Sequence, residues 1–140
     1  MSSRPLITIY IPNHNYADYI EKAVGSVLGQ TLSDYELIII DDGSTDSSQK
    51  VIAQWESNPR IRIIFQQNKG LNITNNIALR LARGRYIMRL DADDYLDENA
   101  LQLLSQVLDR EPEVGLVFPD YHLADKKGEI LETVRRHDFN

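Results

Sequence analysis

Short apolar runs alternate along the chain with segments of helical periodicity. Nearly continuous apolar or β-branched runs predict strands at residues 6–11, 35–40, 61–65, 85–90 and 114–118. Apolar residues spaced three or four apart predict helices at residues 17–28, 46–58, 73–81 and 97–110. Strands that alternate with helices predict an α/β fold, in which a mainly parallel sheet carries helices on both faces.

Turn and capping residues stand at the predicted boundaries. Gly29 is expected to end the first helix in a left-handed conformation, and Gly84 to close the third. Asp46 is expected to cap the start of the second helix. Near the end of the chain, two short extended runs flank residues 125–128, which indicates a hairpin.

Polar loops follow four of the predicted strands. They lie at residues 12–15, 41–44, 68–70 and 91–94. In parallel α/β sheets, ligands bind beyond the carboxyl ends of the strands. We therefore expect the four loops to form one site.

An acidic cluster, Asp91, Asp93 and Asp94, follows the fourth predicted strand. Mutual repulsion raises the cost of ionising all three carboxylates unless a cation is present, and oxygen ligands suit Mg²⁺ or Mn²⁺. The alternative is a solvated turn in which Asp94 or Asp97 caps the fourth helix.

The segment Asp41-Asp-Gly-Ser44 also allows two interpretations. Gly43 and Ser44 suit a tight turn, in which an aspartate does no more than cap. Asp41 directly ends an apolar strand, so we expect it to accept a hydrogen bond from a base or ribose and Ser44 to be structural.

Composition narrows the function classes. With 140 residues the chain is expected to form a single domain, residues 1–140. It has no cysteine, which excludes thiol nucleophiles and cysteine-ligated metals, and a net charge of −6 makes nucleic acid an unsuitable partner. No window has the 18 or so apolar residues of a membrane span.

Six segments together resemble the family 2 glycosyltransferases, over about residues 5–130. They are residues 11–15, 26–31, 39–46, 68–71, 82–86 and 90–94. The resemblance implies the nucleotide-binding half of a GT-A (Rossmann-like) fold, truncated at the acceptor-binding side. It also implies a nucleotide-diphosphate sugar, most often a uridine one, as donor.

The resemblance also implies roles for particular residues. The first loop, Pro12, Asn13, His14 and Asn15, packs against base and ribose, and Asp41 accepts a hydrogen bond from the base. Asn68, Lys69 and Gly70 close over the nucleoside. In Asp91-Ala92-Asp93, Asp91 approaches the ribose or the metal's water shell, and Asp93 binds the Mn²⁺ or Mg²⁺ that bridges the phosphates.

The implied reaction is inverting transfer to a glycan or lipid-linked acceptor, with a carboxylate general base expected beyond Asn140. The expected location is the cytoplasm, at the inner face of a membrane if a larger parent protein is attached there. Many relatives have an aromatic residue where this chain has His14, so the resemblance implies that stacking on the base is either weaker here or replaced by a hydrogen bond.

Two other interpretations of the chain's function remain open. Asp41-Asp-Gly-Ser-Thr45 fits the Asp-x-Gly-x-Thr motif of haloacid-dehalogenase-like phosphatases, although a whole βα unit precedes it here. The chain could also be a nucleotide-binding module without turnover.

Overall fold

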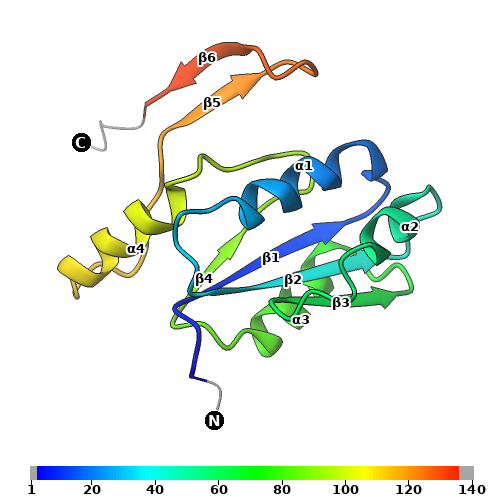
Figure 1. Cartoon of the computed structure of the whole chain (residues 1–140), viewed down its shortest axis with the longest axis horizontal. Helices are drawn as coiled ribbons and strands as arrows, with labels where there is room; N and C mark the ends of the chain where they lie inside the picture. The colour runs from blue at the N-terminus through cyan, green and yellow to red at the C-terminus, as the bar shows by residue number, and fades with distance from the viewer. Residues whose placement is uncertain (1–2, 136–140) are drawn as a thin grey trace. The chain divides into compact units, whose positions relative to one another are not determined.

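A parallel sheet organises the first of two structural units in the computed structural model, which describes residues 3–135. Its strands are β1 (Ile7–Asn13), β2 (Tyr35–Asp42), β3 (Ile61–Gln66) and β4 (Tyr86–Arg89). They lie in the order β3-β2-β1-β4, and all three pairings are parallel (Figure 1). The α/β class with a mainly parallel sheet is therefore confirmed.

Helices cover both faces of this sheet, as expected. They are α1 (Ala17–Leu28), α2 (Ser48–Ala53) and α3 (Leu71–Leu81), and α4 (Ala100–Arg110) begins at the end of the first unit. One core joins α1 and α2 to Ile9, Leu37 and Ile39. The other joins α3 to Tyr10, Ile38 and Ile40 on the opposite face. Alternation along β2 thus divides its side chains between two cores.

The helix ends differ from several expectations. Gly29 has a φ of −85° and is not left-handed. Helix α3 ends at Leu81, and Gly84 serves a different purpose, because a Cβ there would lie 2.3 Å from the backbone nitrogen of Thr8. Asp46 lies one residue before the N-cap of α2, yet its carboxylate accepts hydrogen bonds from the backbone N–H of Ser48 and of Ala17, so it ties the starts of α1 and α2 together.

The second unit, residues 103–140, contains the predicted hairpin but lacks the predicted fifth strand. Strands β5 (Tyr121–Ala124) and β6 (Ile130–Val134) pair antiparallel, and Gly128 in the turn has a φ of +85°. Residues 114–118 form no strand, so this prediction is wrong. An apolar run becomes a strand only where another strand supplies its ladder of hydrogen bonds, and within residues 3–135 none pairs with it.

The buried carboxylate of Glu36 stabilises the amino ends of the strands, opposite the polar loops. Glu36 accepts hydrogen bonds from the hydroxyl of Thr8 and from both the backbone and the guanidinium of Arg83. Burial by itself raises the pKa of Glu36, but these hydrogen bonds and the charge of Arg83 outweigh it and hold the pKa below its ordinary value. The connection from α3 to β4 is thereby fastened to β1 and β2.

Within residues 3–135, none of the helices has both the length and the apolar composition needed to cross a membrane.

Candidate functional site

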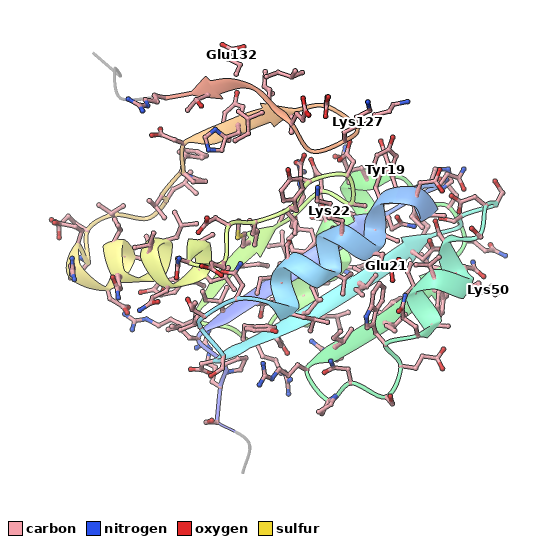
Figure 2. The ribbon with its side chains drawn as sticks, turned by 45° about the horizontal axis from the view of Figure 1, so that its top comes forward. Tyr19, Glu21, Lys22, Lys50, Lys127 and Glu132 are labelled. Carbon is pink, nitrogen blue, oxygen red and sulfur yellow. The ribbon has the colours of Figure 1, made fainter. Side chains whose placement is uncertain are left out.

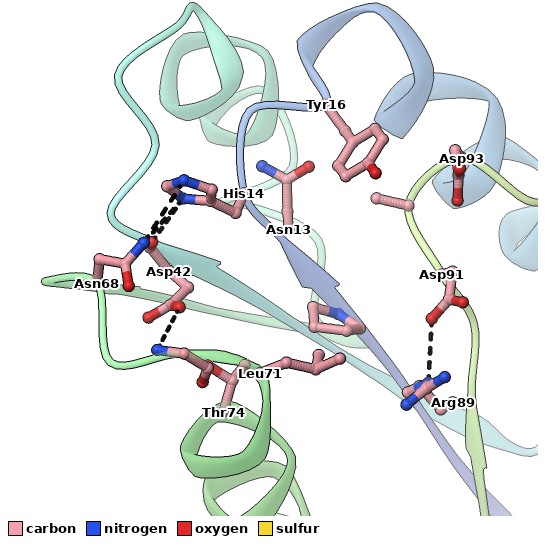
Figure 3. Close-up of a pocket in the computed structure, with 13 residues that line it drawn as sticks. Asn13, His14, Tyr16, Asp42, Asn68, Leu71, Thr74, Arg89, Asp91 and Asp93 are labelled. Atoms are coloured by element: carbon pink, nitrogen blue, oxygen red, sulfur yellow. Dashed lines mark hydrogen bonds and ion pairs between the residues drawn. The ribbon is translucent and has the colours of Figure 1, made fainter.

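A pocket of about 420 Å³ lies at the carboxyl ends of the parallel strands in the first unit (Figure 3). The predicted donor-binding residues that line it are Pro12, Asn13, His14, Asn68, Gly70, Asp91, Ala92 and Asp93. The lining residues that the sequence reasoning did not name are Tyr16, Asp42, Leu71, Thr74 and Arg89. The four loops therefore do converge on one site.

Asp41 lies beneath the pocket instead of in its lining. Its side chain is fully buried, and both carboxylate oxygens are occupied. Oδ1 accepts from Asn13 at 2.8 Å and from the Ser44 hydroxyl at 2.6 Å, whereas Oδ2 accepts from the Ser44 backbone and Gln49. The phosphatase interpretation needs this carboxylate as an accessible nucleophile, and the structure does not offer one. Ser44 has the structural role expected of it.

Asp42, the next residue, is the carboxylate that lines the pocket. Its Oδ1 accepts hydrogen bonds from Gln66 at 2.9 Å and from the Lys69 backbone at 2.8 Å, and its Oδ2 accepts one from the Gly70 backbone at 2.9 Å. Burial raises the pKa of Asp42, but these hydrogen bonds and an electrostatic contribution from His14 outweigh it and lower the pKa overall. Asp42 is therefore ionised and acts only as an acceptor near neutral pH.

Alternation along β2 explains why the two aspartates differ. Asp41 shares its face with Leu37 and Ile39, which pack under α1 and α2. Asp42 shares the opposite face with Ile38 and Ile40, which pack against α3. The loop that enters α3 crosses this second face, so a sequence argument that paired faces with helices could have favoured Asp42.

The other two predicted residues outside the pocket lining shape its loops. Asn15 has a φ of +59°, and its side-chain oxygen accepts hydrogen bonds from the backbone N–H of Thr45, at 2.7 Å, and Asp46. Lys69 contributes its backbone N–H to Asp42. Asn15 thus fastens the loop after β1 to the loop after β2, which supports the pocket from outside.

His14 joins two of the loops at the end of the pocket where Asp42 and Asn68 lie. Its Nδ1 lies 2.9 Å from the backbone oxygen of Asp42, so in the neutral ring Nδ1–H donates and Nε2 is an acceptor. The side-chain nitrogen of Asn15 lies 3.4 Å from Nε2. That of Asn68 lies 3.5 Å from Nε2 (Figure 3). His14 is therefore part of a hydrogen-bonded wall.

Asn13 contributes an acceptor without a partner. The residue is only 2 % exposed, and its Nδ2 donates to Asp41 and Ser44, which fixes the orientation of the amide. Its Oδ1 is buried and has no hydrogen-bond partner within residues 3–135. An unpaired buried acceptor is costly, so this oxygen is available to accept a hydrogen bond from a ligand or water in the pocket.

The acidic end of the pocket holds Asp91 and Asp93. Arg89 Nε forms an ion pair with Asp91 Oδ1 at 3.0 Å, whereas Asp93 has no ion-pair or hydrogen-bond partner for its carboxylate within residues 3–135. Nearby, burial and the charges of Asp93 and Asp91 raise the pKa of Asp94. The local potential is therefore negative and suits a cation.

The donor set fits a divalent cation that is shared with a ligand. Carboxylate oxygens suit Mg²⁺ and Mn²⁺. Among the described residues, no group of three or more histidine, cysteine, aspartate or glutamate side chains is arranged to hold a metal alone. The pair Asp91 and Asp93 would leave most coordination positions to water and to oxygens of the ligand, as phosphate groups provide.

The sequence profile of Glycosyl transferase family 2 matches residues 8–134. The chain is 39% identical over 128 residues to the chondroitin synthase of Escherichia coli. The aligned residues make up 91% of this chain and 19% of that protein. The chain is 34% identical over 131 residues to the putative teichuronic acid biosynthesis glycosyltransferase TuaG of Bacillus subtilis, covering 92% of this chain and 52% of that protein. The chain thus spans about a fifth of the length of the chondroitin synthase and about half of the length of TuaG.

Solved structures share the fold. S. aureus TarS 1–349 in complex with UDP-GlcNAc superposes with a TM-score of 0.71 at 22% identity, over 76% of this chain and 32% of that one. The mannosyltransferase PcManGT from Pyrobaculum calidifontis, in complex with GDP-Man and Mn²⁺, superposes with a TM-score of 0.69 at 25% identity, over 76% of this chain and 33% of that one. The fold is thus that of the GT-A glycosyltransferases, and the chain belongs to glycosyl transferase family 2.

Proposed function

We propose that this chain binds a nucleotide-diphosphate sugar, with uridine as the nucleoside, and a divalent cation for inverting transfer of the sugar to a glycan acceptor. The observation that carries the proposal is the division of one pocket between an ionised Asp42 at one end and Asp91 with Asp93 at the other. Such a pocket offers acceptors for a base and ribose and a cation site for a diphosphate.

At the nucleoside end, Asp42 selects a base that carries a ring N–H. Its Oδ2 accepts only the Gly70 backbone N–H among the described residues, which leaves a lone pair for a ligand. Uracil and guanine carry such an N–H, and the ring nitrogen of cytosine does not. Asn13 Oδ1 receives a second donor, from the base or a ribose hydroxyl, and Leu71 and Pro12 supply apolar surface.

At the diphosphate end, Asp93 is the direct cation ligand and Asp91, held by Arg89, lies nearer the ribose or the cation's water shell. A bound divalent cation neutralises the charge that grows on the departing diphosphate. Inversion also needs a general base at the acceptor hydroxyl, and we assign none of the residues 3–135 to that role.

Thermal-shift and calorimetric titrations with UDP, GDP, CDP and ADP test the proposal, each with Mn²⁺ and with chelator. A ligand present at 100 times its Kd stabilises the folded chain by about 2.7 kcal/mol. We expect UDP to bind most tightly, CDP weakly, and Mn²⁺ to strengthen UDP binding. Asp34→Asn, which changes an exposed aspartate just before β2, is the matched control for Asp93→Asn. Equal binding of all four nucleotides, or none, would reject the proposal.

A further inference from the structure

Three exposed tyrosines and one lysine extend from the acidic end of the pocket along α1. Tyr16, Tyr19 and Tyr95 are 40%, 38% and 43% exposed, and Lys22 lies among them. Tyr16 also lines the pocket, on the side where Asp93 lies (Figure 3). We call these four residues the tyrosine platform.

The rings of Tyr16 and Tyr19 pack against each other at the start of α1. The centroids of Tyr16 and Tyr19 are 6.0 Å apart, and their planes meet at 67°, an edge-to-face pair. The carbonyl of Tyr16 accepts the backbone N–H groups of Tyr19 and Ile20, both at 3.0 Å, at the first turn of α1. Asp46 holds the next N–H, that of Ala17, at 3.0 Å. The backbone that carries both rings is therefore held by hydrogen bonds, and an ordered backbone lowers the entropy lost on binding.

Lys22 and Tyr95 continue the same surface. Tyr19 and Lys22, three residues apart, lie along one side of α1 (Figure 2). The Lys22 ammonium is 3.7 Å from the centroid of the Tyr95 ring, a cation–π contact. The loop that carries Tyr95 is fastened to α1, because the Leu96 backbone N–H donates to the Ser26 hydroxyl at 3.0 Å. The platform therefore connects α1 with the loop that holds Asp93.

We propose that the tyrosine platform is a subsite for a sugar ring of the acceptor glycan. This inference rests on the proposed function. The acceptor hydroxyl must reach the anomeric carbon of the donor, which is attached to the diphosphate, and we place the diphosphate at Asp93. Because Tyr16 lines the pocket beside Asp93 and the platform continues from it, an acceptor chain that arrives at this end lies on the tyrosines.

The chemistry of the platform suits a saccharide. A pyranose ring has an apolar C–H face and a rim of hydroxyl groups. Tyrosine rings present flat apolar area together with a phenolic hydroxyl, so they contact both parts of the sugar. Lys22 keeps N–H donors for sugar hydroxyls while one side of its ammonium faces Tyr95. The sugar of the acceptor is thereby positioned by stacking and oriented by hydrogen bonds.

Saturation-transfer NMR with cellotetraose and with a hyaluronan tetrasaccharide, in the presence of UDP and Mg²⁺, tests this inference on the 140-residue chain. We expect at least one of these probes to bind. We expect Tyr16→Ala and Tyr19→Ala each to weaken that binding by about tenfold, and Tyr16→Phe to retain it, since the stacking area remains. Tyr121→Ala removes a tyrosine of matched exposure, 40%, from the hairpin and serves as the control.

The same samples separate this inference from the proposed function. UDP binding without contact to either oligosaccharide would overturn the acceptor subsite and leave the nucleotide site standing. Oligosaccharide binding that is equally strong in Tyr16→Ala and Tyr19→Ala would also overturn it. Absence of UDP binding in the unmodified chain would instead overturn the proposed function. Both tyrosines are exposed, so we expect the two alanine variants to fold. Their melting temperatures check this, so that a loss of binding is not mistaken for unfolding.

Discussion

Asp42→Ala is the substitution that most directly tests how the base is chosen. The change removes the carboxylate at the end of the pocket where we propose that the nucleoside binds. It also frees the backbone N–H groups of Lys69 and Gly70, which Asp42 holds at 2.8 and 2.9 Å. The variant should therefore lose both a contact with the base and the fixed position of the loop that covers it.

The magnitude follows from the kind of hydrogen bond that is lost. A hydrogen bond to a charged group contributes about 1.5–3 kcal/mol, which corresponds to a loss of UDP affinity of about 10- to 150-fold. The loop contribution weakens all nucleotides alike, whereas the base contact weakens only those with a ring N–H. The ratio of UDP affinity to CDP affinity therefore isolates the contact with the base.

Isothermal titration of UDP and CDP into the unmodified chain, Asp42→Ala and Asp41→Ala measures this ratio. We expect the unmodified chain to prefer UDP at least about tenfold and Asp42→Ala to bind both nucleotides weakly and equally. Asp41→Ala should chiefly lower the melting temperature, because it leaves Asn13 and Ser44 without their buried partner. An unchanged UDP-to-CDP ratio in folded Asp42→Ala would refute the reasoning.

Three further predictions concern the cation, the sheet and the loops. Asp93→Asn should abolish the Mn²⁺-dependent part of UDP binding in calorimetry, while Asp91→Asn weakens it less; the reverse order would contradict the assigned ligand. Glu36→Gln should lower the free energy of unfolding in urea by about 2 kcal/mol at pH 7. Because the pKa of Glu36 is lowered by folding, its contribution is complete above the unfolded value of about 4.3 and is lost as the pH falls through the lower folded value, so the two chains should converge in acid. Gly43→Ala should destabilise the chain and weaken UDP binding in the same assays, since φ is +71° and the added Cβ would lie 2.5 Å from the Asn68 nitrogen; normal stability and affinity would show that the loop yields freely.

Local sequence patterns were enough to predict the segments whose structure depends mainly on their own residues. The continuous apolar run from Tyr35 to Ile40 predicted a strand buried on both faces, and all of β2 is buried. Helical periodicity predicted α1 with its observed ends, Ala17 and Leu28. The alternation of strands with helices indicated a parallel sheet, in which the carboxyl ends of the strands meet at one edge. It therefore also predicted that Asn13, Asn68 and the Asp91 loop come together, as they do in the pocket.

Other features depend on which segments meet in space. Residues 114–118 have the composition of a strand, but a ladder needs a partner, and composition does not supply one. Gly84 could be taken for a helix cap until its close approach to Thr8 was known.

The sequence alone therefore determined the α/β class, the order of most elements and the edge of the sheet where the polar loops gather. Only the tertiary structure decided that Asp42 lines the pocket and Asp41 lies beneath it, because the two-residue period of a strand separates neighbours without saying which face meets which helix. It also brought Tyr16, Thr74 and Arg89, which lie on different elements, to the lining of one pocket. They are distant in sequence and none belongs to a loop that the pattern marked, so their meeting depends on the order of strands in the sheet.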